Sequence, residues 1–101
     1  MTLQPASGAR DLSPQQVKKN YLIASKLSSL YRLWGYERIS PPHIERLETL
    51  MAAGGISSNE ILKIVSDEPL GLRPEITASI VRAASTRFNE YERPLRFWST
   101  A

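Results

Sequence analysis

Cysteine does not occur in the 101 residues of the sequence, and histidine occurs once, as His43. Without cysteine the chain has neither a disulfide framework nor a thiolate metal site. A single imidazole with no carboxylate cluster at ligand spacing is a poor metal site, and no nucleophile–base–acid set can be assembled around it. We therefore expect no metal, no cofactor and no catalytic residue, and we expect His43 to be structural or exposed.

Phosphate-binding glycine loops are missing as well, since Gly54 and Gly55 are followed by neither a lysine nor a helix cap. Neither positive nor negative charge dominates the chain, because the net charge is only +3 at pH 7. Glu90 and Glu92 interrupt the arginines in the last third of the chain. A solvated surface explains this pattern better than a nucleic-acid face does, so nucleic-acid binding is not expected.

Long hydrophobic runs are absent too. The densest apolar stretch near the start, Tyr21–Ala24, is far too short to span a bilayer. Residues 1–8 have no basic segment followed by an apolar one, so no secretory signal is visible. The sequence thus predicts a cytoplasmic protein with no membrane contact.

Hydrophobic residues make up 42% of the chain, which is enough to build the core of one small domain. Ser13, Pro14 and Gln16 form a helix start signal, with an N-cap hydroxyl, a proline at the first position and a capping box. Gly35 is a typical helix stop. A helix over residues 14–34 is therefore predicted, with an apolar stripe wide enough to be buried. The stripe comprises Val17, Tyr21, Ala24, Leu27, Tyr31 and Trp34.

Shorter elements follow this helix. The patterns predict a strand over 36–40 closed by two prolines, a short helix over 45–51 stopped by Gly54–Gly55, and strands over 61–65 and 70–73. They also predict a long helix that starts at Pro74 and frays near Asn89, and a last strand over 95–101. Only antiparallel strands accept a turn as tight as the one at residues 67–69. We therefore expect an α+β fold, a mainly antiparallel sheet with flanking helices, in a single domain over 1–101.

The junction from Leu72 to Thr77 is the segment richest in possible chemistry. Arg73 precedes a proline and should end its strand in extended geometry. Glu75 and Thr77 then fall in the first helical turn, with side chains that point in different directions. A carboxylate and a hydroxyl there can hold a ligand's ammonium group. A glutamate in a first turn is also favoured by the helix dipole whatever the function, so both interpretations stay open.

Three blocks together carry a resemblance: Gly8–Asp11 with Pro14, the helix and strand that lead to Pro42, and Leu72–Thr77. They resemble the start of the catalytic fold shared by histidyl-tRNA synthetases and the synthetase-like regulatory subunits of ATP phosphoribosyltransferase. The synthetases carry Leu-Arg-Pro-Glu-Gly-Thr, whose glutamate and threonine contact the amino group of histidine. Glu75 and Thr77 match these positions, whereas Ile76 replaces the glycine. The regulatory subunits commonly have a larger apolar residue there, so Ile76 favours them.

The resemblance also gives expectations for other residues. The helix, strand and Pro42 match the first signature motif of class II synthetases, which builds a dimer interface. Self-association through the first helix and strand is therefore implied, with Trp34 and Tyr36 in the core or interface. Arg10 and Asp11 match a block at the start of both families and offer a local ion pair, although a simple turn is an equal explanation. Arg73 belongs to the histidine-binding block. Glu45 matches a family glutamate to which we assign no role.

By this resemblance the chain is the N-terminal segment of a class II synthetase-like core, truncated before the second signature motif. It implies a non-catalytic regulatory subunit of ATP phosphoribosyltransferase, a glycosyltransferase of the first step of histidine biosynthesis. Its partner would be the short-form catalytic subunit, with allosteric feedback by histidine. Two alternatives remain: a fragment of a histidyl-tRNA synthetase that uses ATP, histidine and tRNA, and a helical interaction module. The last strand should lack its later neighbours, which would leave an unpaired edge, expose Phe97 or Trp98 and promote self-association.

Overall fold

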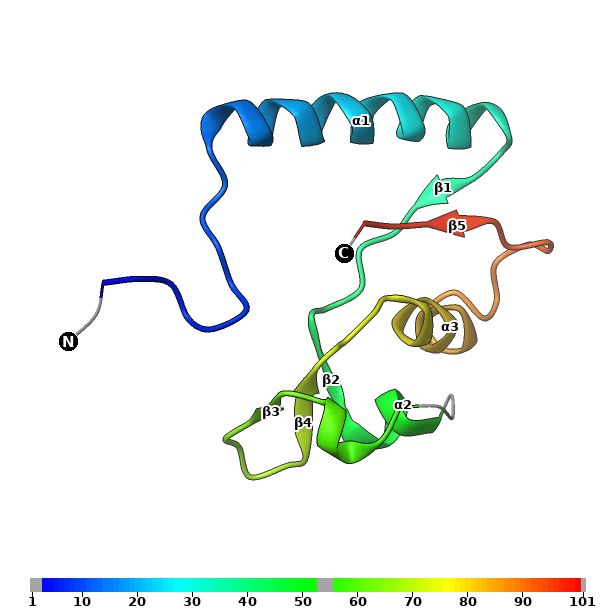
Figure 1. The fold of residues 1–101 in the computed structure, drawn as a ribbon. Coiled ribbons are helices and arrows are strands. Elements are labelled where there is room, and N and C mark those ends of the chain that lie inside the picture. The colour runs from blue at the N-terminus through cyan, green and yellow to red at the C-terminus, as the bar shows by residue number, and fades with distance from the viewer. Residues whose placement is uncertain (1–2, 53–55, 101) are drawn as a thin grey trace. The chain divides into compact units, whose positions relative to one another are not determined.

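The computed structural model describes residues 3–52 and 56–100. The chain divides into two compact units, Met1–Gly35 and Tyr36–Ala101, each of which is described by itself. The first unit contains an irregular segment and helix α1, Pro14–Leu33 (Figure 1). The second contains the remaining elements. No described helix is both long enough and apolar enough to cross a membrane.

Helix α1 begins with the predicted capping box. The Ser13 hydroxyl accepts a hydrogen bond from the Gln16 amide at 3.3 Å, and the Gln16 side-chain oxygen accepts one from the Ser13 amide at 2.9 Å. Gly35 follows the helix with φ of +80°, a conformation that glycine adopts at little cost. These local signals therefore predicted the helix correctly, with an end one residue earlier than expected.

The apolar stripe of α1, predicted to be wide enough to be buried, is not buried within this chain, because α1 has no buried residue. Tyr21 is 72% exposed and Trp34, just past the helix, is 73% exposed, while Ala24 and Tyr31 are half-buried. The physical reason is that α1 is the only helix or strand among residues 3–35. Its own unit therefore offers no second surface on which the stripe can pack.

The second unit has two small sheets. One is antiparallel, with strand order β2-β4-β3, formed by β2 (Ile44–Arg46), β4 (Leu70–Leu72) and β3 (Lys63–Ile64). The other is a parallel pair of β1 (Glu37–Arg38) with β5 (Phe97–Trp98). An α+β fold with a mainly antiparallel sheet is thereby confirmed. The parallel pair was not predicted, since it joins strands from opposite ends of this unit.

Strand β5 pairs with β1 on one side only, so among the described residues its other edge is unpaired, as expected. Phe97 and Trp98 are half-buried, and β5 pairs in register with Glu37 and Arg38 of β1. The Arg38 guanidinium lies 5.1 Å from the centre of the Trp98 ring, and the rings of Phe88 and Phe97 are 5.2 Å apart. The expected exposure of these two aromatic residues is therefore wrong.

Helix α2 runs from Leu47 to Ala52, so the prediction of a helix over 45–51 starts too early. Glu45 and Arg46 lie in β2, where they pair with Gly71 and Leu70 of β4. Their local helix preference is overridden by these inter-strand hydrogen bonds. A 3₁₀ turn at Ser58–Glu60 follows. The predicted stop at Gly54–Gly55 lies outside the described residues.

Helix α3, Thr77–Ser85, starts three residues after the predicted position. Residues 74–76 instead form a bend, in which the Glu75 carboxylate accepts a hydrogen bond from the Thr77 amide. The helix also ends before Asn89, because the Phe88 amide donates a hydrogen bond to the Ala83 carbonyl oxygen and so closes the last turn. Strands β3 and β4 are where the sequence placed them, although each is shorter than expected.

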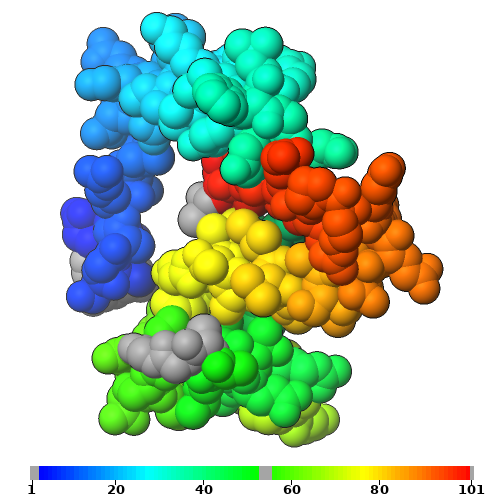
Figure 2. Space-filling model, turned by 90° about the vertical axis from the view of Figure 1, so that its right-hand side faces the viewer, coloured from blue at the N-terminus to red at the C-terminus, as the bar shows by residue number. Residues whose placement is uncertain are grey.

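The core of the second unit lies where α2 packs against α3 and the antiparallel sheet. Figure 2 shows the α3 residues in yellow directly against the green residues of β2 and α2. Leu50, Ile61 and Ala83 are buried. Gly71 has no room for a side chain, because a Cβ there would come within 2.6 Å of Ile61 Cγ2 and 3.0 Å of Leu47 Cδ2. The sheet and helices therefore pack closely at the middle of β4.

Candidate functional site

Arg73, the residue after β4, holds the proline pair that precedes β2. Its Nη1 donates hydrogen bonds to the carbonyl oxygens of Pro41 at 3.0 Å and Pro42 at 2.9 Å. Its backbone amide donates to the carbonyl oxygen of His43 at 3.0 Å. Neither proline lies in a strand, so their carbonyl oxygens have no partner in a strand ladder, and Arg73 supplies a donor to both. The structure thus brings together two of the predicted motif residues, Arg73 and Pro42.

Glu75 and Thr77 also lie together, at the start of α3. The Glu75 Oε2 atom accepts a hydrogen bond from the Thr77 amide at 2.8 Å. This bond, with smaller contributions from the Thr77 hydroxyl and the Ala78 amide, lowers the pKa of Glu75 below its usual 4.5. The two side chains do not point apart as expected, because Glu75 precedes the helix and the helical angle per residue does not apply.

This arrangement provides an exposed, ionised carboxylate next to a hydroxyl. A carboxylate has about four acceptor positions, so the bond to Thr77 leaves Glu75 able to accept from an ammonium group. Its binding to an amino group remains a prediction. The same carboxylate also caps α3, since it satisfies amides that have no partner within the helix.

A pH titration is expected to report on the Glu75 cap of α3 independently of the rest of the fold. The folded-state pKa of Glu75 is below 4.5, so its stabilising contribution is complete at higher pH and is lost as pH falls through that lowered value. The NMR shift of the Thr77 amide should titrate with a midpoint below 4.5, and Glu75→Gln should abolish that titration. Glu90→Gln, at an exposed position, serves as control. A midpoint at or above 4.5 would contradict the cap.

The sequence did not predict an ion pair that joins β2 to α3. Arg82 Nε donates to both oxygens of Glu45, at 2.7 and 3.2 Å, and the Glu45 side chain is only 3% exposed. The prediction that Arg82 lies on a solvated face is therefore wrong. In the sequence, the match of Glu45 to a family glutamate was the only signal for this pair. The residues around Glu45 favour a helix, in which the Glu45 side chain would be exposed.

The Glu45–Arg82 pair lines a pocket of about 370 Å³ on the second unit. A second ion pair lines the same pocket, in which Arg46 Nη1 lies 3.0 Å from Glu68 Oε2. The latter side chains are 63% and 50% exposed. One pocket thus contains a pair with a buried carboxylate that reaches α3 and an exposed pair that joins β2 to the turn before β4.

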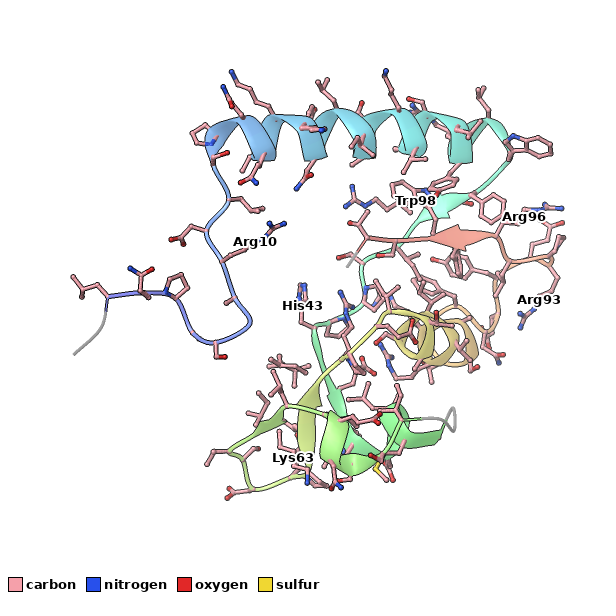
Figure 3. The ribbon with its side chains drawn as sticks, viewed as in Figure 1. Arg10, His43, Lys63, Arg93, Arg96 and Trp98 are labelled. Atoms are coloured by element: carbon pink, nitrogen blue, oxygen red, sulfur yellow. The ribbon has the colours of Figure 1, made fainter. Side chains whose placement is uncertain are left out.

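The remaining predicted residues are exposed. Arg10 lies in the irregular segment before α1 (Figure 3). Asp11 follows it, and the two form no ion pair with each other. Trp34 is the residue before Gly35, which ends the first unit, and Tyr36 opens the second. His43 is exposed on the segment between β1 and β2, which agrees with the expectation for it. Among residues 3–52 and 56–100, no group of three histidine or acidic side chains is placed to hold a metal ion.

Comparison with known proteins identifies the lineage of this arrangement. A family model described as histidyl-tRNA synthetase matches residues 8–101. The chain belongs to the histidyl-tRNA synthetase family. Its synthetase-like fold is also that of a crystal structure described as an ATP phosphoribosyltransferase regulatory subunit/histidyl-tRNA synthetase from Bacillus halodurans. That similarity has a TM-score of 0.88 at 27% identity and covers 100% of this chain and 27% of the other.

Curated members of the family are much closer in sequence. A protein of Prochlorococcus marinus (strain NATL1A) named ATP phosphoribosyltransferase regulatory subunit is 93% identical over 99 residues. A protein of the same name from another strain of Prochlorococcus marinus is 62% identical over 100 residues. The alignments cover 98% and 99% of this chain. The chain spans about a quarter of the length of each relative, 25% and 26%.

Proposed function

We propose that this chain is the N-terminal segment of a regulatory subunit of ATP phosphoribosyltransferase, within a single synthetase-like domain. The observation that carries the proposal is the 93% identity to a protein of that name over nearly the whole chain. Ile76 supports it, since a β-branched residue stands where the synthetases have glycine. Ile76 is half-buried with φ of −93° and needs no glycine conformation.

The proposed role is regulatory and not catalytic. The subunit would act in the cytoplasm with the short-form catalytic subunit, a glycosyltransferase that performs the first step of histidine biosynthesis. Histidine would act as an allosteric effector, with its amino group bound at Glu75 and Thr77. Support for this site comes from the exposed, ionised carboxylate beside the Thr77 hydroxyl.

Self-association through α1 and the strand after it is part of the same proposal. The support is the exposed apolar surface of α1, because exposed apolar patches commonly mark contact surfaces. The large side chains that are exposed on and just after α1 are Val17, Tyr21, Leu22, Ile23, Leu27, Leu30, Leu33 and Trp34.

The test uses the complete gene product that contains this sequence and a short-form catalytic subunit. Phosphoribosyltransferase activity is measured with and without the gene product over a range of histidine concentrations. We expect the gene product to raise the activity and make it sensitive to histidine. Allosteric coupling is commonly about 1–3 kcal/mol, which corresponds to an effect of about 5–150-fold.

A histidyl-tRNA synthetase is the second candidate, with which the family model and the double description of the Bacillus halodurans structure are consistent. Histidine-dependent ATP–pyrophosphate exchange distinguishes the two. If the gene product catalyses this exchange and leaves phosphoribosyltransferase activity unchanged, the regulatory proposal is wrong. Glu90→Gln, at an exposed turn position, serves as a control variant, because a loss of activity in it would indicate damage to the protein during preparation.

A further inference from the structure

The residues from Glu75 to Thr77 are fixed on both sides by side chains that reach one short segment, residues 41–45. Before them, Arg73 donates to the carbonyl oxygens of Pro41 and Pro42. After them, Arg82 of α3 pairs with the buried carboxylate of Glu45. Figure 3 shows this segment leading from the bend at His43 into β2. The start of α3 is thus held between two anchors.

We propose that Glu45 and Arg82 are positioning residues, whose ion pair at the buried Glu45 carboxylate sets the rotation of α3 on β2 and so the placement of Glu75 and Thr77. This inference rests on the proposed amino-group site. Neither Glu45 nor Arg82 would contact the ligand. Their effect would pass through helix α3, along which Arg82 lies about 7–8 Å from Thr77.

The burial of the Glu45 carboxylate favours one rotation of α3 over the others. A carboxylate as buried as that of Glu45 is strongly disfavoured unless a cation and hydrogen bonds compensate its charge. Arg82 meets this need with one nitrogen shared between both oxygens. A rotation of α3 by one residue, about 100°, would remove the guanidinium and leave the charge alone. Other rotations of the helix are therefore disfavoured.

The same pocket supplies the control. Arg46 and Glu68 form an ion pair of similar length, but both side chains are exposed and neither belongs to α3. Exposed pairs contribute about 0–1 kcal/mol, so their loss should leave the helix in place. A comparison of the two pairs separates positioning of α3 from a general effect of removing charges from this pocket.

The test compares two double variants of the complete gene product, E45Q/R82Q and R46Q/E68Q. Neutralising both members of the buried pair leaves no uncompensated buried charge, so the first variant is designed to fold. Hydrogen exchange of the peptide that contains residues 75–80 is measured by mass spectrometry. The histidine concentration for half-maximal regulation of the catalytic subunit is measured in parallel, and unfolding midpoints report on global stability.

In E45Q/R82Q we expect exchange over residues 75–80 to become about tenfold faster and the half-maximal histidine concentration to rise about tenfold, with maximal regulation retained. R46Q/E68Q should change both by less than about twofold. Equal effects in the two variants, or unchanged exchange in E45Q/R82Q, would overturn the inference. A further outcome is that hydrogen exchange becomes faster in E45Q/R82Q alone while histidine has no effect on the activity of the catalytic subunit with any form of the gene product. That result supports the positioning role of Glu45 and Arg82 and refutes regulation by histidine.

Discussion

Leu50→Ala is expected to destabilise the second unit by about 3 kcal/mol, since removal of a buried leucine side chain generally costs about 2–5 kcal/mol. Leu50 is 1% exposed, on the face of α2 that packs toward α3 and the sheet. The substitution would lose apolar burial and leave a cavity in the core. Urea unfolding, followed by far-UV circular dichroism, measures the change.

Met51→Ala is the matched control, because Met51 is the next residue of α2 and is 42% exposed. Its side chain loses little buried area, so a change below about 1 kcal/mol is expected. If Leu50→Ala and Met51→Ala destabilise the protein equally, the core does not lie on the side of α2 where the structure places it.

Arg82→Met is expected to cost about 3 kcal/mol, because it leaves the Glu45 carboxylate buried without its counter-ion. Glu45→Gln should cost less. It leaves the guanidinium of Arg82, which at 32% side-chain exposure can still be hydrated, and it retains an acceptor oxygen. This asymmetry follows directly from the different burial of the two side chains. Chemical unfolding of both variants at neutral pH measures it.

Arg46→Met supplies the comparison for an exposed pair. Because the side chains of Arg46 and Glu68 are both at least half exposed, its loss should change stability by about 0–1 kcal/mol. An Arg82→Met variant no less stable than Arg46→Met would show that the Glu45 carboxylate is solvated in solution, contrary to the structure.

The sequence predicted those elements whose signals are local. Helix α1 has its cap, first-position proline and terminal glycine within its own residues, and it was predicted to within one residue. The turn before β4 likewise specified an antiparallel hairpin. The end of β2 was mistaken for helix because Glu45 and Arg46 are good helix formers, while the strand depends on Gly71 and Leu70 far along the chain.

The candidate site shows the same division. Glu75 and Thr77 came from a contiguous block, and the structure does bring them together. The Glu45–Arg82 pair depends on the packing of a strand against a helix, which no pattern in either segment specifies. A glutamate between Ile44 and Arg46 is ordinary for an exposed strand or helix, so its burial could not be read from composition or spacing.

The hydrogen bonds of Arg73 bear on how such blocks persist over evolution. Its guanidinium supports the carbonyls of Pro41 and Pro42, and Glu75 caps the following helix, whether or not an amino acid is bound. Selection for a folded chain alone would therefore preserve most of the Leu72–Thr77 block after a binding activity had disappeared. Such a block can mark ancestry in a chain that no longer binds an amino acid.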